Sequence, residues 1–389
     1  MNLKNSGDQI KYNIELNPYV LLTYGFIFLV LFDSFYLGTI FKFSFFLIIV
    51  STGLLGFFFQ KKNLDNYLIF YFLIIITFLS YSLIVANLRY GFLNYNNFIY
   101  VKFLLITFTL VFFNLFKINT IKPFNNILVF FGIITILLFL TSVIFNFEDI
   151  RPVFEHKKII IHQNNNFTFI SFSFSPMFII SSSYFLDRIN NNKNRFNLLC
   201  FLINLLPLFI SGERANIFIG TLLLLLLFFI LIKKFYFRLL LILILILFSY
   251  YLGIFNYFDV TDDNNLKKLN FFYEYKIIFS KLNIILFGQG SGFNNFWITL
   301  NYFSPIVEPT YLEMLRFFGF FGSSLLFVLI FYPIFLILDM KSYKFLKKNI
   351  FLFTGFFFYL IISVVNPHLL NTHGFLIILI LINEILNNE

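Results

Sequence analysis

Apolar residues occur along the chain in long runs that short polar segments interrupt. Runs of about 17 to 25 apolar residues match the length of helix that crosses the hydrocarbon core of a bilayer. Windows such as 216–232 are apolar on all sides, so their helices face lipid or other helices rather than water. The pattern therefore predicts about 12 transmembrane helices. They are expected near residues 18–37, 43–59, 66–86, 96–116, 125–145, 167–186, 196–209, 216–232, 237–255, 310–338, 350–365 and 374–386.

Composition supports this interpretation, because 60% of the 389 residues are hydrophobic and only 12% are charged. A soluble domain carries about 25% charged residues. We therefore predict an all-α, polytopic integral membrane protein with a single transmembrane domain over residues 1–389. The net charge of +10 is spread in small clusters between apolar runs, which argues against a nucleic-acid-binding surface.

The basic clusters predict how the helices are oriented, because lysine and arginine are enriched in the cytoplasmic loops of membrane proteins. If the N-terminus is cytoplasmic, every loop on the inner side is basic, and both termini lie in the cytoplasm. Two longer loops, 146–166 and 256–308, then lie on the outer side. The basic residues of the inner loops are Lys61, Lys62, Lys117, Lys122, Arg188, Lys193, Arg195, Lys233, Lys234, Arg238, Lys341, Lys344, Lys347 and Lys348.

Four arginines are expected at the outer face: Arg89, Arg151, Arg214 and Arg316. Charges kept at the edge of a membrane span are candidates for function. A guanidinium forms two parallel hydrogen bonds with phosphate oxygens, so the set suggests a site for a phosphorylated, membrane-bound substrate. The alternatives are ordinary loop residues for the first two, and ion pairs with Glu213 and Glu313 for Arg214 and Arg316.

Glu308 and Pro309 mark the expected start of the helix near 310–338, and Pro309 is expected to occupy the first helical position, where proline is favoured. The positive helix end favours the ionised form of Glu308. An ionised carboxylate at the rim of a polar cavity can accept a proton from a sugar hydroxyl. Tyr311 is expected on nearly the same face, where it can stack on a sugar ring. The alternative for Glu308 is a role in helix-end structure alone.

The remaining polar motifs are weaker signals. His368 lies in the last outer turn and is a candidate for the same cavity, with a structural role in the turn as the alternative. The four histidines show no metal-ligand spacing, and we expect neither a metal ion nor another cofactor. The GQGSGF segment at 288–293 lacks the lysine and the preceding strand of a nucleotide-binding loop, so we interpret it as a flexible loop.

Four segments in order resemble the bacterial O-antigen polymerase and ligase superfamily: SGERANIFIG, LFGQGSGFNNF, EPTYLEMLRFFGFFG and NPHLLN. Members have a Ser-x-Ser-Arg-like turn, a Gly-x-Gly loop, a late span that begins His-Asn-x-Tyr-Leu-Glu and is followed by Gly-x-x-Gly, and a late Asn-Pro turn. The resemblance covers residues 211–371. Ligases of the superfamily have histidine where this chain has Glu308, which favours the polymerase branch.

The resemblance implies glycosyl transfer at the periplasmic face of the bacterial inner membrane. An undecaprenyl-diphosphate-linked glycan is the donor, and a lipid-linked repeat unit is the acceptor. Arg214 is the first candidate to stabilise the departing diphosphate, and Glu308 is the candidate base. Arg89, Arg151, Arg316, Tyr311 and His368 are the candidate substrate-binding residues.

The resemblance also implies partners: a lipid-linked oligosaccharide as substrate, the surrounding membrane lipids, and a chain-length regulator and a flippase, with no nucleic acid. Two alternative functions stay open. An O-antigen ligase would transfer finished glycan to a lipid A core. A polysaccharide flippase or secondary transporter would keep polar residues near the membrane midplane. Lys102, inside an expected span, is the main exception to the low charge at mid-depth, and it can either mark a transport pathway or extend its amine outward to the membrane surface.

Overall fold

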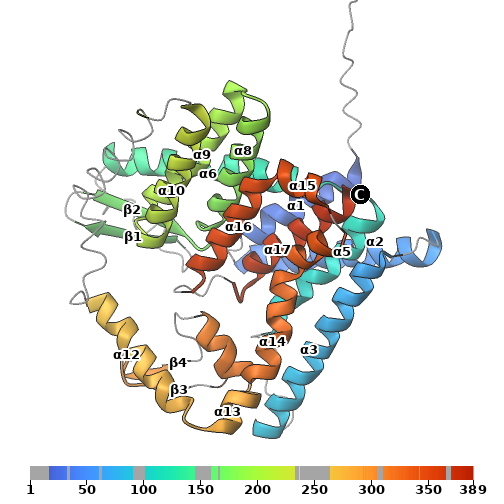
Figure 1. Cartoon of the computed structure of the whole chain (residues 1–389), viewed down its shortest axis with the longest axis vertical. Helices are drawn as coiled ribbons and strands as arrows, with labels where there is room; N and C mark the ends of the chain where they lie inside the picture. The colour runs from blue at the N-terminus through green and yellow to red at the C-terminus, as the bar shows by residue number, and fades with distance from the viewer. Residues whose placement is uncertain are drawn as a thin grey trace, which may run out of the picture.

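The computed structural model describes residues 17–32, 36–60, 64–90, 101–144, 159–164, 167–232, 236, 263–291, 293, 295–304, 310–340, 342–364 and 369–388. Helices dominate this part of the chain (Figure 1). The helices are α1 (Pro18–Leu31), α2 (Tyr36–Gln60), α3 (Asn66–Tyr90), the 3₁₀ helix η1 (Lys102–Phe108), α5 (Thr109–Leu115), α6 (Ile121–Ile144), α8 (Met177–Asn191), α9 (Arg195–Ile210), α10 (Arg214–Leu231), α12 (Asp263–Ile278), α13 (Leu282–Phe287), α14 (Thr310–Asp339), α15 (Tyr343–Lys348), α16 (Ile350–Ile362) and α17 (Thr372–Asn387).

Five helices of the described chain are long and apolar enough to cross a membrane. These stretches are Phe41–Phe59, Asn66–Arg89, Ile121–Ile144, Arg214–Leu231 and Thr310–Asp339. Five shorter apolar helices accompany them, at Pro18–Leu31, Phe103–Leu115, Arg195–Ile210, Ile350–Ile362 and Thr372–Asn387. The chain is therefore a helical membrane protein, as predicted. The number of about 12 spans stays a prediction, and the span expected at 237–255 lies outside the described residues.

Two antiparallel hairpins interrupt the helical pattern of the described residues, and neither was expected from the sequence. Strands β1 (Ile159–Asn164) and β2 (Phe167–Phe172) pair from Ile159↔Phe172 to Asn164↔Phe167. The helix expected at 167–186 therefore begins only at Met177, in α8. The FTFISF segment forms a strand because phenylalanine, isoleucine and threonine favour extended, half-buried backbone. The second hairpin joins β3 (Asn295–Trp297) to β4 (Tyr302–Ser304).

Close contacts between helices rely on small residues. A side chain on Gly355 of α16 would collide with Ser183 of α8, whose Cβ lies 2.6 Å from the position of an added Cβ. On α6, an added Cβ at Gly132 would lie 2.7 Å from the Ile203 carbonyl oxygen of α9. Lipid provides no hydrophobic force that pushes helices together, so membrane helices associate through close packing. Small residues allow the close approach that this packing requires.

Two buried carboxylates cap helices other than their own. Asp187 of α8 accepts hydrogen bonds from the backbone N–H groups of Phe351 and Leu352, at 3.0 and 2.7 Å, in the first turn of α16. Glu384 of α17 accepts hydrogen bonds from Thr120 and Ile121 at the start of α6, at 3.0 and 3.2 Å. The first N–H groups of a helix have no partner within it, so these carboxylates connect neighbouring helices through their ends.

Both caps lie at one end of the bundle, together with described basic residues from three of the predicted inner loops. Asn191, near the end of α8, donates a hydrogen bond to the Lys348 carbonyl oxygen at 3.1 Å. At the same end, Tyr67 at the start of α3 donates to Asp339 at the end of α14, at 2.8 Å. We call this the basic end. Its described lysines and arginines are Lys117, Lys122, Arg188, Lys193, Arg195, Lys344, Lys347 and Lys348.

Replacing Asp187 with alanine is expected to lower the free energy of unfolding by about 1–2 kcal/mol, because the first turn of α16 loses its cap in a buried site. Asp187→Asn keeps an acceptor oxygen and should lose less. Thermal unfolding in detergent measures both changes. Equal stability of the wild type and Asp187→Ala would show that the cap contributes nothing.

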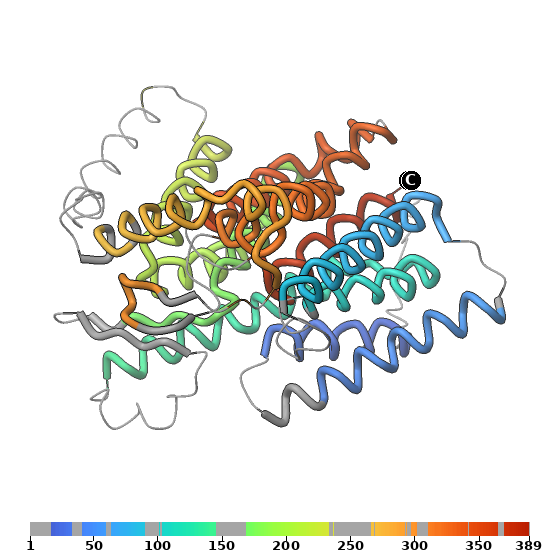
Figure 2. Tube along the Cα trace, turned by 90° about the horizontal axis from the view of Figure 1, so that it is seen from below, coloured from blue at the N-terminus to red at the C-terminus, as the bar shows by residue number. Residues whose placement is uncertain are grey.

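A smaller unit lies at the other end, where α12, α13 and the β3–β4 hairpin form the lower part of the molecule (Figure 1). Seen from below, α12 crosses in front of the bundle (Figure 2). The unit has its own core, in which Phe271 and Tyr275 of α12 pack on Trp297 of β3. The loop predicted over 256–308 therefore contains ordered helices and a hairpin.

Candidate functional site

Helix α14 is broken at Gly319, where φ is 62° and ψ is −172°. A broken helix leaves carbonyl oxygens without partners inside the helix. The chain supplies partners from elsewhere: Gln289 N–H donates to the Arg316 oxygen at 2.6 Å, and Gly290 N–H donates to the Phe317 oxygen at 3.0 Å. The Tyr81 hydroxyl of α3 donates to the Phe318 oxygen at 3.0 Å. The segment after α13 therefore completes the hydrogen bonding of the break.

Glycine is required on both sides of this contact. Gly288 has a φ of 80°, and an added Cβ would lie 2.6 Å from the Phe317 carbonyl carbon and 2.7 Å from the Gly319 nitrogen. Backbone meets backbone here, so no side chain can move aside to make room. The GQG segment and the LRFFG segment, which are distant in sequence, form one joined structural unit.

Arg316 and Glu313 form a buried ion pair directly before the break. Arg316 is 0% and Glu313 1% exposed, and Nη2 of the arginine lies 2.6 Å from Oε2 of the glutamate. The arginine Nη1 also donates to the Gln289 side-chain oxygen and to the Phe293 carbonyl oxygen, both at 3.1 Å. The ion pair proposed from the i, i+3 spacing is therefore present, and it also binds the loop.

Two aromatic residues of the lower unit complete this arrangement. The Arg316 guanidinium lies 5.6 Å from the ring centre of Trp297, a distance suited to a cation–π interaction. The Tyr275 hydroxyl donates a hydrogen bond to Glu313. Burial and the Glu313 carboxylate raise the pKa of Tyr275, so its hydroxyl keeps the proton that it donates. We call the set Tyr275, Gln289, Phe293, Trp297, Glu313 and Arg316 the Arg316 junction.

The turn between α9 and α10 is a second polar cluster. The Glu213 carboxylate accepts hydrogen bonds from the Ser171 hydroxyl of β2 at 2.5 Å and from the buried Asn216 amide at 2.9 Å. Gly212 packs on Phe169 of β2, whose Cγ lies 2.5 Å from the position that a Cβ added to Gly212 would take. Arg214 follows as the half-buried first residue of α10. The β1–β2 hairpin thus orients the turn that presents Arg214.

The structure describes four of the seven predicted site residues, and all four lie at the end opposite the basic end. Arg89 is exposed in the last turn of α3, which starts at the basic end. Arg214 begins α10 after an antiparallel turn from α9. Tyr311 donates its hydroxyl to the Leu360 oxygen near the end of α16, at 3.0 Å. Arg316 is buried in its junction. Glu308, Arg151 and His368 lie outside the described residues.

These positions separate two kinds of residue. Arg89 and Arg214 are accessible from this end, whereas the Arg316 guanidinium is enclosed by protein groups, so its substrate-binding role stays a prediction. Tyr275, Gln289 and Trp297 were not selected from the sequence, because no spacing rule connects them to Arg316. Within the described residues, no group of three or more His, Cys, Asp or Glu side chains could hold a metal ion.

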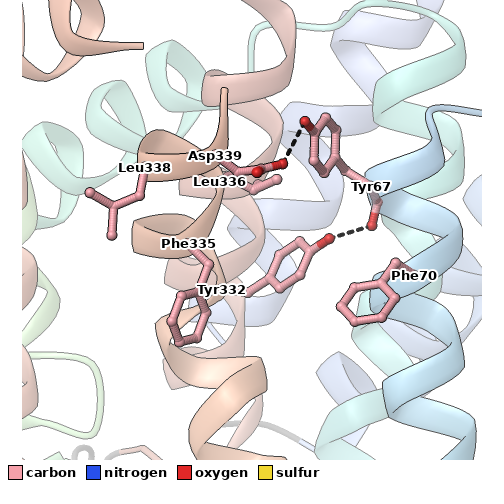
Figure 3. A pocket seen from close by; sticks show the side chains of 7 residues that line it. All are labelled: Tyr67, Phe70, Tyr332, Phe335, Leu336, Leu338 and Asp339. Carbon is pink, nitrogen blue, oxygen red and sulfur yellow. Dashed lines mark hydrogen bonds between the residues drawn. The ribbon is translucent and has the colours of Figure 1, made fainter. Parts of the chain in front are cut away.

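An open groove of about 500 Å³ lies at the basic end, between α3 and α14 (Figure 3). Its polar contacts are already formed within the protein: Tyr67 donates to Asp339, and Tyr332 donates to the Tyr67 carbonyl oxygen at 2.5 Å. Phe70 and Phe335 contribute aromatic walls. The groove lining includes none of the predicted site residues that the structure describes, so the groove is not the candidate site.

Comparisons with protein-family models, with curated proteins and with solved structures give no match to this chain. The functional interpretation therefore depends on the sequence motifs and on the geometry around them.

Proposed function

We propose that this protein is a polysaccharide polymerase of the O-antigen type, which joins undecaprenyl-diphosphate-linked repeat units at the periplasmic face of the inner membrane. The observation that carries the proposal is the joined unit of the GQG loop and the LRFFG helix. These segments belong to two of the motifs that resemble the superfamily, and they pack on each other at the end that also carries Arg89 and Arg214.

In the proposed reaction, a sugar hydroxyl of the acceptor attacks the anomeric carbon of the donor glycan. The bond from that carbon to the phosphate oxygen breaks, and the undecaprenyl diphosphate leaves with the electron pair. Glu308 takes the hydroxyl proton. The diphosphate is a good leaving group, so the reaction needs no nucleotide.

Arg214 is proposed to stabilise the diphosphate. It is the first residue of the 18-residue helix α10, whose N-terminal end carries a partial positive charge. Ser171 and Asn216 bind the adjacent Glu213 carboxylate and orient the turn. Guanidinium and helix end then act on the same developing negative charge.

The orientation follows from the same proposal. The basic end faces the cytoplasm together with both termini, and the Arg214 end faces the periplasm. A flippase that delivers lipid-linked units to the periplasmic side and a chain-length regulator are the proposed partners. The reaction itself requires only the lipid-linked substrate and the membrane.

The test is to incubate the purified protein, in lipid nanodiscs, with undecaprenyl-diphosphate-linked repeat units and no nucleotide. Wild-type protein should produce longer glycans. Arg214→Ala should lower the rate by about 10- to 100-fold, because it removes charge-assisted hydrogen bonds. Arg195→Ala, which changes an exposed arginine at the first residue of α9, is the matched control. Full polymer length with Arg214→Ala would contradict the role of this residue.

A cellular test separates the polymerase from a ligase. A deletion strain should accumulate single-repeat glycans on the carrier lipid if the protein is a polymerase. Accumulation of long chains on the carrier would instead identify a ligase.

The break in α14 is a structural feature that favours a transporter, since discontinuous helices often form the substrate sites of transporters. In such sites the freed backbone groups bind the substrate. Here Gln289, Gly290 and Tyr81 already occupy the carbonyl oxygens at the break. Proteoliposomes that translocate lipid-linked oligosaccharide without lengthening it would establish the transporter instead.

A further inference from the structure

Helix α12 has two faces of different character. One face packs inward: Phe271 and Tyr275 contact Trp297 in the core of the lower unit. On the same side, the Glu274 carboxylate accepts hydrogen bonds from the backbone N–H groups of Ile298 and Thr299, both at 2.9 Å. This face is fully explained by its contacts with the β3–β4 hairpin.

The opposite face of α12 is apolar and exposed. Leu266, Leu269, Tyr273 and Ile277 follow one another at spacings of three and four residues, so they form a single stripe along the helix. Tyr273 and Ile277 are each 68% exposed, and Phe272 beside them is 51% exposed. A helix that packs on protein with one face and meets water with the other has polar residues on the second face. The stripe therefore requires an apolar environment.

The apolar surface continues toward the transmembrane helices. In α13, Leu282 and Phe287 are exposed. The Phe287 ring lies 5.6 Å from the ring of Phe321, measured between centroids. Phe320 and Phe321 are exposed on the candidate span of α14. Exposed apolar side chains thus lead from α12 to a surface that faces lipid.

Charge in this segment favours a phospholipid surface. Lys267, Lys276 and Lys281 are exposed along α12 and the turn that follows it. Basic residues beside an apolar stripe are typical of helices that lie in the membrane interface, where lysine binds anionic headgroups.

We propose that residues 263–287 form an interfacial anchor, which lies in the headgroup region of the leaflet at the end opposite the basic end. The stripe enters the acyl boundary, and the lysines bind anionic phospholipid. Since Tyr275 connects α12 to Glu313, the anchor holds the Arg316 junction and the GQG loop at the membrane surface. The proposal rests on the exposed stripe and does not depend on the glycosyl-transfer reaction.

The test measures the depth of side chains in the full-length protein. A nitroxide label is placed on Ile277→Cys or Tyr273→Cys in a Cys200→Ser background and compared with Lys267→Cys on the flank of the helix. The protein is reconstituted in vesicles of phosphatidylethanolamine and phosphatidylglycerol. We expect the ratio of oxygen accessibility to nickel-chelate accessibility to be several-fold higher at 273 and 277 than at 267. Vesicles without phosphatidylglycerol should show a smaller difference.

Two results would overturn the proposal. Nickel access at 273 and 277 equal to that at 267 would mean that the stripe faces water. Shielding from both reagents would mean that protein covers it, and dipolar broadening that disappears on dilution with unlabelled chain would identify a second copy.

If Cys200→Ser does not fold, the spin-label experiment is replaced by a fluorescence experiment on Tyr273→Trp in the otherwise native chain. Brominated lipids should then quench the fluorescence more strongly than in the wild type, whose single tryptophan is the buried Trp297. No additional quenching would count against the anchor.

Discussion

Arg316→Ala is expected to lower the free energy of unfolding by about 3–5 kcal/mol, because it leaves the buried Glu313 carboxylate without its counter-ion. The Gln289 side chain and the Phe293 carbonyl oxygen would lose donors at the same time. Gln289 and Phe293 lie in the loop after α13, whereas Arg316 lies on α14, so the substitution removes bonds between the two segments. The lower unit should therefore detach from α14 before the bundle unfolds. Increased proteolysis of residues 263–304 at temperatures below global unfolding would detect this order.

Two further variants test whether the unpaired charge is the cause. Arg316→Met combined with Glu313→Gln removes both charges and should recover a substantial part of the loss. Arg195→Ala changes an exposed arginine and should alter stability by no more than about 0.5 kcal/mol. Thermal unfolding of purified protein in one detergent compares all of them. If Arg316→Ala were as stable as Arg195→Ala, the junction would not support the fold.

Gly319→Ala is expected to be similarly severe, for a reason that concerns the backbone alone. The φ of 62° and ψ of −172° belong to a region that only glycine adopts readily, and other residues lose about 1–3 kcal/mol there. An added Cβ would also lie 2.5 Å from the Leu286 carbonyl oxygen. The GQG loop would have to move away from α14, and the carbonyl oxygens at the break would lose their partners.

Gly220→Ala provides the matched control, since Gly220 lies inside α10 with helical neighbours. Its nearest obstacle is the tip of the Phe209 ring, 3.2 Å from an added Cβ, and that ring can shift. Unfolding temperature and exposure of Gly288 to limited proteolysis should change for Gly319→Ala and stay near wild type for Gly220→Ala. Equal behaviour of the two variants would show that the loop does not depend on the backbone contact.

Several helices agree with the hydropathy pattern to within a few residues. The expected span at 310–338 corresponds to α14 (Thr310–Asp339), and that at 66–86 corresponds to α3 (Asn66–Tyr90). The agreement has a simple cause: lipid requires a long apolar run in each span, and the run is visible in one dimension. Helix α12 was not predicted, because its pattern combines a protein-facing side with an exposed apolar stripe and lacks such a run.

The candidate site was only partly predictable. The pair of Glu313 and Arg316 follows from spacing on one helix, whereas the GQGSGF segment was expected to be a flexible loop and is instead hydrogen-bonded to the break in α14. The spacing did not identify the other partners, since Tyr275 and Trp297 reach the pair through contacts that no local pattern records. The hairpin that orients Glu213 was also missed, because FTFISF is apolar enough to be read as the start of a span.

Sequence alone determined that this chain is a helical membrane protein. The fraction of apolar residues and the length of the apolar runs are properties of the sequence, and together they require a bilayer around the helices. The sequence also predicted which loops are basic, and their described members lie together at one end. Only the tertiary structure decided that the GQG loop completes a broken helix and that Arg316 is enclosed rather than open to the surface. Those outcomes depend on backbone groups from distant segments that meet at hydrogen-bond distance, and such a meeting is a property of the folded chain.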